Sequence, residues 1–216
     1  VKAASGILAG AGTAQKNSAL SAVAEEILAN RDAILKENAV DISKGIRKGL
    51  SAAMVDRLSL DQNRIDNLVS CINDVVNMKD PVGEMKTLPN GLKAGRMKVP
   101  VGVFAVIFES RPNVSVEVSA LSIKSGNGVI LRGGSDAINT SRFLCRLIRK
   151  GLVRAGLPED CVVMVDNTSR ESVLHLVKMR DYVDVVIPRG GPDLIRLVEE
   201  TSVIPVIRHD MGICHT

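Results

Sequence analysis

The sequence is poor in aromatic residues: its 216 residues include three Phe, one Tyr and no Trp. Proteins that bind single-stranded nucleic acid use aromatic side chains as stacking platforms, so this scarcity argues against that class of function. The core has to be built from Val, Ile, Leu and Ala, as is typical of buried parallel strands and the helices that cover them. The apolar share of 45% is large enough for such a core.

Charge and hydrophobic runs set further limits. The net charge is only +4, and no run of Lys and Arg is dense enough for a polybasic tail. This excess is typical of an ordinary surface, and alternatively it favours an anionic ligand. The longest apolar run, 101–108, is too short to span a bilayer, and no signal peptide is found. We therefore expect neither a membrane nor a nucleic-acid partner.

The four cysteines, Cys71, Cys145, Cys161 and Cys214, form no CxxC pair. Their spacing fits neither a zinc site nor a disulfide framework, so we predict no metal site and a reducing, cytoplasmic location. Cys71 and Cys145 lie in predicted helices and Cys161 begins a predicted strand, which favours the core for all three. Cys214 adjoins His215, but neighbours in an extended chain point to opposite faces and make a poor catalytic pair.

The first third of the sequence has the periodicity of helices. Apolar residues fall on one helical stripe within 20–28, and further helices are predicted at 32–43 and from Ser51 onward. The segment Ser59-Leu60-Asp61-Gln62 resembles a capping box that opens a helix with an apolar face over 65–76.

Beyond Pro100, strand and helix patterns alternate. Gly126 and Gly156 stand where glycines end helices, and Ser135 and Pro192 stand where helices begin. Such alternation predicts an α/β fold with a doubly wound parallel sheet, preceded by the helical segment. The predicted strands are 92–99 (exposed), 101–108, 128–131, 161–165, 183–187 and 203–207, and the predicted helices are 114–124, 136–155, 170–179 and 192–201.

Arginines and glycine pairs follow the predicted strands. In an open parallel sheet, ligands bind beyond the carboxyl ends of the strands. Gly133-Gly134 and Gly190-Gly191 stand there before predicted helices, and four of the five segments at this edge carry an arginine. Helix N-termini and arginine both suit phosphate, so the pattern predicts a multiply anionic ligand; alternatively, the glycine pairs only make tight turns. No GxGxxG or GxxxxGK[ST] motif is present.

Three long motifs carry a family resemblance. Residues 101–114 (VGVFAVIFESRPNV), 124–135 (KSGNGVILRGGS) and 186–191 (VIPRGG) resemble the hallmark segments of γ-glutamyl phosphate reductases. TAQKN at 13–17 and LSL at 58–60 look like the first helices of that family. The resemblance covers essentially the whole chain.

The family belongs to the aldehyde dehydrogenase superfamily. The resemblance implies NADPH-dependent reduction of γ-glutamyl phosphate to glutamate 5-semialdehyde and phosphate, the second step of proline biosynthesis from glutamate. It implies that a cysteine thiolate attacks the acyl phosphate and that hydride reduces the resulting thioester. An alternative is a stand-alone dinucleotide-binding module without catalytic activity.

The resemblance also implies a division of the protein. Residues 1–90 would be a helical segment packed on the same domain as the dinucleotide-binding part, 91–216. Cys214-His215 resembles the point where the family continues into its catalytic domain, with the nucleophile a few tens of residues further. We therefore expect the catalytic domain to be absent, the chain alone to be inactive, and the full-length enzyme to be a homo-oligomer.

Individual residues take roles from the same resemblance. Asn113 matches the superfamily's oxyanion-hole asparagine, although a helix N-cap after Pro112 is almost equally expected from the sequence. Arg132 falls where the superfamily places a basic residue near the adenosine ribose, which suits a 2′-phosphate and hence NADP over NAD. The cofactor-binding residues predicted in this way are Arg132, Gly133, Gly134, Ser135, Pro188, Arg189, Gly190 and Gly191.

One segment departs from the superfamily pattern. Many aldehyde dehydrogenases have a Glu-Leu-Gly-Gly segment whose glutamate is a general base, and here the corresponding stretch is His209-Asp210-Met211-Gly212. A reductive enzyme that cleaves an acyl phosphate has less need to activate a hydrolytic water. We therefore do not assign that role to Asp210.

Overall fold

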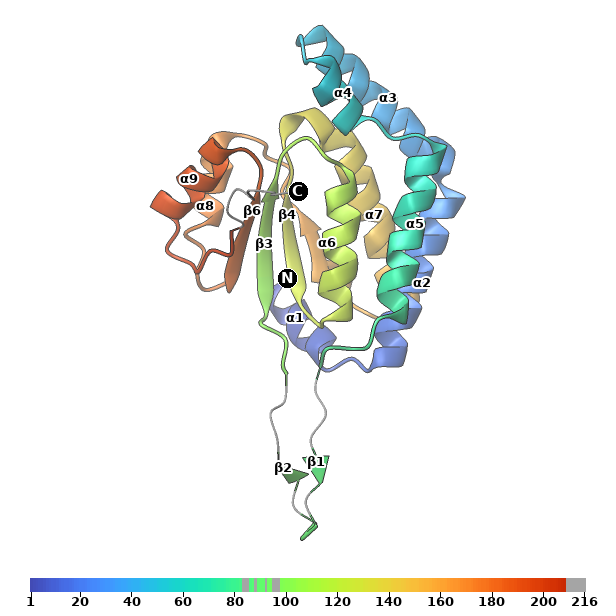
Figure 1. Ribbon diagram of the computed structural model, residues 1–216, viewed down its shortest axis with the longest axis vertical. Coiled ribbons are helices and arrows are strands. Elements are labelled where there is room, and N and C mark those ends of the chain that lie inside the picture. The colour runs from blue at the N-terminus through green and yellow to red at the C-terminus, as the bar shows by residue number, and fades with distance from the viewer. Residues whose placement is uncertain (83–85, 88, 92, 95–97, 209–216) are drawn as a thin grey trace, which may run out of the picture.

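The structure is a computed structural model, and it describes residues 1–82, 86–87, 89–91, 93–94 and 98–208 (Figure 1). The predictions for 209–212 and for Cys214 lie outside the described residues. The α-helices are α1 (Lys2–Ala9), α2 (Thr13–Ala29), α3 (Arg31–Arg47), α4 (Ala52–Leu58), α5 (Gln62–Asn77), α6 (Asn113–Lys124), α7 (Ile138–Arg154), α8 (Arg170–Leu176) and α9 (Pro192–Thr201). The strands are β1 (Lys86–Thr87), β2 (Lys93–Ala94), β3 (Val103–Phe108), β4 (Gly128–Arg132), β5 (Val162–Met164) and β6 (Val185–Arg189), and the 3₁₀ turns are η1 (Ser135–Ala137) and η2 (Glu159–Cys161).

Four parallel strands form the main sheet in the order β5-β4-β3-β6, which confirms the predicted α/β fold. The chain runs outward from β3 to β4 and β5, and then returns to place β6 on the other side of β3. The strand order therefore reverses between β3 and β6, and ligands bind at the carboxyl ends of strands at such a switch point.

Helices cover both faces of the sheet (Figure 1). Side chains of β3 alternate: Val106 and Phe108 belong to the larger core with α6 and α7, whereas Ala105 and Ile107 belong to a smaller core with α8 and α9. Buried strand positions of this kind need residues that are apolar on both faces, which the sequence of β3 provides.

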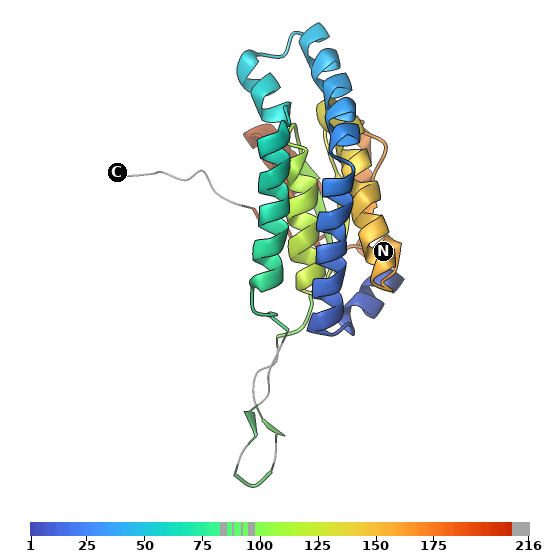
Figure 2. The same ribbon diagram turned by 90° about the vertical axis from the view of Figure 1, so that its right-hand side faces the viewer.

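The N-terminal helices form a second layer over α6 and α7 (Figure 2). Gly151 of α7 makes the approach of α2 possible, because a Cβ atom there would lie 2.7 Å from the backbone nitrogen of Val23. The buried Asp41 of α3 also joins the layers. Its carboxylate accepts hydrogen bonds from the backbone N–H of Thr140 at 2.8 Å and from the Thr140 hydroxyl at 2.7 Å.

Several boundaries differ from the predictions. Asp61, not Ser59, caps α5: its carboxylate accepts from the backbone N–H of Arg64 at 2.7 Å, while the Ser59 hydroxyl donates to the Val55 carbonyl of the preceding helix. The predicted box was therefore wrong by two residues, because Ser59 is already engaged with α4. Helix α1 was not predicted.

The C-terminal elements are shorter than predicted. Helix α8 ends at Leu176, and η1 precedes α7, so the helix predicted over 136–155 begins as a 3₁₀ turn. The strand predicted over 203–207 is wrong: it is an isolated parallel bridge between Val186 and Val206, because Pro205 has no N–H with which to extend a ladder.

Of the strand predicted over 92–99, residues 93–94 form β2, which pairs antiparallel with β1, whereas 98–99 are described and lie outside any strand. Gly126 and Gly156 have φ values of +76° and +72°, as expected for glycines that end helices. Within the part of the chain that the structure describes, no helix is both long and apolar enough to cross a membrane.

Candidate functional site

A pocket of about 440 Å³ lies at the switch point, where β3 and β6 end. The register of β3 and β6 places Phe108 beside Arg189, so the loops that follow these two strands meet. Asn113, Arg189, Gly190 and Gly191 line this pocket, as the carboxyl-edge argument predicts. The other lining residues are Met54, Arg57, Phe108, Glu109, Ser110, Arg111, Val114 and Glu117.

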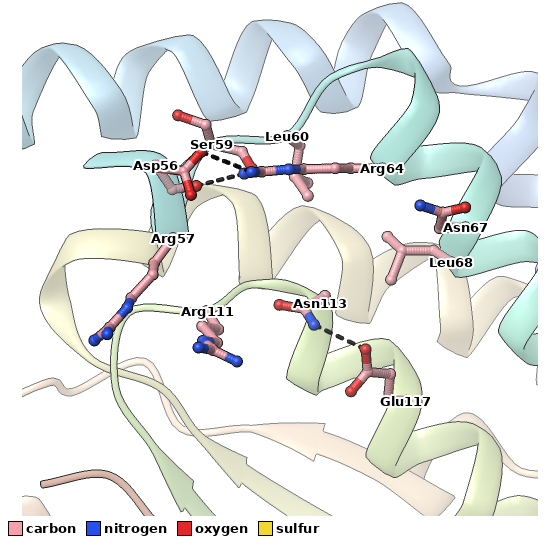
Figure 3. A pocket seen from close by; sticks show the side chains of 10 residues that line it. All are labelled: Asp56, Arg57, Ser59, Leu60, Arg64, Asn67, Leu68, Arg111, Asn113 and Glu117. Atoms are coloured by element: carbon pink, nitrogen blue, oxygen red, sulfur yellow. Dashed lines mark hydrogen bonds and ion pairs between the residues drawn. The ribbon is translucent and has the colours of Figure 1, made fainter. Parts of the chain in front are cut away.

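A second pocket of about 340 Å³ adjoins the first, between the α4–α5 connection and the start of α6 (Figure 3). Arg57, Arg111, Asn113 and Glu117 line both pockets, so the two form one continuous site. The lining residues found in the second pocket alone are Asp56, Ser59, Leu60, Arg64, Asn67 and Leu68.

Asn113 stands at the centre of this site (Figure 3). It is the first residue of α6, and the N-cap position belongs to Pro112, so the alternative of Asn113 as N-cap is wrong. Its side-chain amide instead donates to Glu117 Oε1 at 2.8 Å, one helical turn further along. An amide nitrogen carries two hydrogens, so one remains for an oxygen in the pocket.

Glu109 connects both glycine pairs. Its carboxylate accepts from the backbone N–H of Gly191 at 3.1 Å, at the start of α9, and its carbonyl accepts from the backbone N–H of Gly134 at 3.4 Å. A Cβ atom at Gly190 would lie 2.6 Å from Cδ of Glu109. A side chain at this position would therefore require the exposed Glu109 side chain to shift.

Arg132 is buried, with 7% of its surface exposed, and burial lowers the pKa of its guanidinium. Nη2 donates to the carbonyls of Thr168 and Ser169 at 2.7 and 2.9 Å, and Nε donates to the Ser172 hydroxyl at 3.4 Å. Arg132 thereby holds the loop after β5 against the end of β4. It lines neither of the two pockets, and neither do Gly133, Gly134, Ser135 and Pro188.

Two arginines of the site were not among the predicted site residues, although Arg111 is one of the arginines counted at the carboxyl edge from the sequence. Arg57 comes from α4 and Arg111 from the β3–α6 loop, and both are exposed. Neither has a hydrogen-bond or ion-pair partner among the described residues. Glu117 was also missed, although its spacing of four residues from Asn113 on one predicted helix was a signal that could have found it.

Known proteins resemble this chain over almost all of its length. A γ-glutamyl phosphate reductase from Aquifex aeolicus is 50% identical over 206 residues, which cover 94% of this chain and 47% of the relative. The crystal structure of a γ-glutamyl phosphate reductase from Thermotoga maritima has a TM-score of 0.94 and 40% identity, and the match covers 99% of this chain and 52% of that one. No protein-family model matches.

The chain is homologous to the N-terminal half of γ-glutamyl phosphate reductases. It spans about half the length of the curated relatives that it matches. Proteins of much lower sequence identity share the fold. The structure of an acetylating aldehyde dehydrogenase from Geobacillus thermoglucosidasius has a TM-score of 0.69 at 17% identity, and the match covers 95% of this chain and 43% of that one. The architecture is thus that of aldehyde dehydrogenases.

Three of the four cysteines lie among the described residues, and all three are free thiols. Burial raises the pKa of Cys145 and of Cys161 to about 11, so both are thiols at neutral pH. Burial, together with the nearby carboxylates of Glu117 and Asp74, also raises the pKa of Cys71. None of these three cysteines has the lowered pKa that an activated nucleophile needs.

Proposed function

We propose that this chain supplies the cofactor-binding part and an oxyanion donor of an NADPH-dependent γ-glutamyl phosphate reductase, which forms glutamate 5-semialdehyde and phosphate. The observation that carries the proposal is the position of Asn113, whose side chain lines the pocket at the switch point of an aldehyde dehydrogenase fold. The similarity to γ-glutamyl phosphate reductases at 50% identity supports the choice of substrate.

Asn113 would act on the acyl oxygen of the substrate. When a nucleophile adds to an acyl phosphate, this oxygen becomes negative, and an amide N–H that is already aimed at it lowers the barrier. The hydrogen bond to Glu117 at 2.8 Å fixes the direction of the Asn113 amide before the substrate arrives. Removal of one such donor in an enzyme costs on the order of 10²–10³ in kcat.

The carboxyl edge fits an anionic dinucleotide, because Arg189 is exposed there beside the start of α9. When bound, NADPH would supply the hydride. The Glu109 carboxylate accepts from the backbone N–H of Gly191 and would have to move before a pyrophosphate could accept from that N–H. The Glu109 side chain is exposed and has room to do so. Arg132 Nε and Nη2 already donate to Ser172, Thr168 and Ser169, so the N–H groups of Nη1 would contact the 2′-phosphate of NADPH.

The thiol would come from outside the described residues, since Cys71, Cys145 and Cys161 all have raised pKa values. Their free thiols are consistent with the proposed reducing, cytoplasmic location. The same observation favours the second candidate for this chain taken alone, a dinucleotide-binding module without catalytic activity. Both candidates predict that the purified chain does not reduce γ-glutamyl phosphate, and measurable turnover would overturn our assignment of the thiol.

Cofactor choice tests the dinucleotide site. The purified chain should bind NADPH more tightly than NADH in a fluorescence titration, and Arg132→Ala should weaken NADPH binding about tenfold more than NADH binding, since one charge-assisted contact is lost. The NADH titration controls for displacement of the loop that Arg132 holds. Arg170→Ala, at an exposed arginine of α8, is the matched variant. Equal loss for both cofactors would remove Arg132 from the 2′-phosphate role.

A further inference from the structure

The second pocket, between the α4–α5 connection and α6, has the size and the composition of a site for a small polar molecule. Ligand pockets occupy roughly 300–1,000 Å³, and this one, at about 340 Å³, is at the small end. Its wall combines cationic, anionic and amide side chains with two leucines, Leu60 and Leu68 (Figure 3). Such a wall suits a ligand that carries charges of both signs on a short hydrocarbon chain.

The arginines of the pocket differ in whether they already have hydrogen-bond or ion-pair partners. Arg64 is held by its own neighbours: it donates to the Ser59 carbonyl at 2.7 Å, to the Asp56 carboxylate at 2.7 Å and to the Asp56 carbonyl. Arg57 and Arg111, by contrast, have no hydrogen-bond or ion-pair partner among the described residues. These two guanidinium groups are therefore the ones that a carboxylate could bind.

Glu117 supplies the opposite charge. It is half-buried, and one of its oxygens accepts from Asn113. A carboxylate has about four lone-pair sites, so this bond leaves Glu117 able to accept from a ligand. A ligand with only negative charges would be repelled by it, whereas an ammonium group would be attracted.

An α-amino acid satisfies both requirements, because it places an ammonium and a carboxylate on one carbon. We propose that this pocket binds the α-amino-acid end of γ-glutamyl phosphate, with the α-ammonium at Glu117 and the α-carboxylate at Arg57 and Arg111. The inference rests on the proposed function, which sets the acyl group at Asn113. Since Asn113 and Glu117 are one helical turn apart and line both pockets, the substrate chain would run from the first pocket into the second.

L-glutamate, glutarate and 4-aminobutyrate test the recognition of the ammonium and of the α-carboxylate separately. Glutarate is glutamate without its ammonium, and 4-aminobutyrate is glutamate without its α-carboxylate. In NMR titrations of the purified chain, L-glutamate should bind more tightly than either of them. Glu117→Gln keeps an oxygen that accepts from Asn113 and removes only the charge. It should weaken L-glutamate binding about tenfold, the usual effect of losing one charge-assisted hydrogen bond, and leave glutarate binding unchanged or improved.

Arg57→Gln provides the reciprocal variant, at an exposed position of α4 where folding is not at risk. It should reduce the preference for L-glutamate over 4-aminobutyrate. Glu171→Gln, at an exposed glutamate of α8 outside the pocket, should change none of these preferences. Equal binding of L-glutamate and glutarate, or equal loss of both in Glu117→Gln, would overturn the inference.

NADPH titration of the same samples distinguishes the two proposals. Normal NADPH binding without a preference for L-glutamate would overturn the amino-acid pocket and leave the reductase proposal standing. A preference for L-glutamate that is lost in Glu117→Gln, found together with absent NADPH binding, would support the pocket and count against the reductase.

Discussion

The two ends of the central sheet use their charged residues differently. At the amino end, the buried Lys16 forms an ion pair with Asp80 at 2.9 Å, and the buried Lys124 donates to Asn17 Oδ1 at 2.7 Å and to the Val76 carbonyl at 2.8 Å. At the carboxyl end, Arg57 and Arg111 are exposed without such partners among the described residues. Removal of one member of a buried charge pair destabilises the fold because the other charge is left uncompensated, whereas unpaired charges that face a pocket are available to a ligand.

The largest effect on stability should come from the amino end. Lys16→Met should lower the free energy of unfolding by about 3 kcal/mol, because it leaves Asp80 without its buried partner. Urea denaturation measures the change. Lys36→Met, at an exposed lysine of α3, is the control and should stay close to the wild type. A small effect of Lys16→Met would mean that the amino end does not depend on its buried charges.

An intermediate loss of stability is expected when Asp184 is replaced. Its carboxylate accepts hydrogen bonds from Lys2 Nζ at 2.6 Å and from the backbone N–H of Val103 at 2.8 Å. Burial opposes ionisation, but these hydrogen bonds outweigh it and hold the pKa of Asp184 below its ordinary value of 3.8. A lowered pKa stabilises the folded state above pH 3.8, and this contribution is lost as the pH falls through the lowered value.

Asp184→Asn should therefore cost about 1 kcal/mol at neutral pH, and the difference from the wild type should shrink on acidification below pH 3.8. Thermal unfolding at a series of pH values would show this. Asp181→Asn is the matched variant, because no hydrogen bond or ion pair of Asp181 occurs among the described residues. A difference that persists at low pH would contradict the role of the Asp184 charge.

The smallest effect on stability belongs to the carboxyl end. The double variant Arg57→Gln, Arg111→Gln should change the free energy of unfolding by no more than about 0.5 kcal/mol, as for exposed residues without partners. The same variant should lose binding of L-glutamate, measured by NMR titration. Clear destabilisation would show that these arginines hold the fold, and the contrast between the two ends would then disappear.

Local patterns in the sequence predicted most of the fold. The alternation of apolar runs with capped helices located β3, β4, β5, β6 and α6 to α9, because strand and helix periodicities are properties of short segments. The prediction was less exact where two residues could cap the same helix. Ser59 and Asp61 both suit the start of α5, but the Ser59 hydroxyl bonds to the end of α4 and Asp61 is the cap.

The site was only partly predictable, because it depends on contacts between distant segments. The carboxyl-edge rule correctly brought Asn113 and Gly190-Gly191 to one pocket. It could not bring Arg57 there, since Arg57 belongs to a helix whose position depends on packing of the N-terminal layer. Nor could it predict that Arg132 turns toward the loop after β5, because the carbonyls of Thr168 and Ser169 become its partners only in the folded chain.

The α4–α5 connection, which lines the second pocket, is held by the side-chain amide of one buried residue. Asn38 of α3, which is 1% exposed, donates to the Leu58 carbonyl at 2.9 Å and accepts from the backbone N–H of Leu60 at 2.7 Å. These two bonds fix the connection between α4, which carries Arg57, and α5, which carries Arg64. A change at Asn38 would therefore alter ligand affinity from a position that no ligand touches. A screen for binding defects should recover such interior substitutions beside those in the pocket itself.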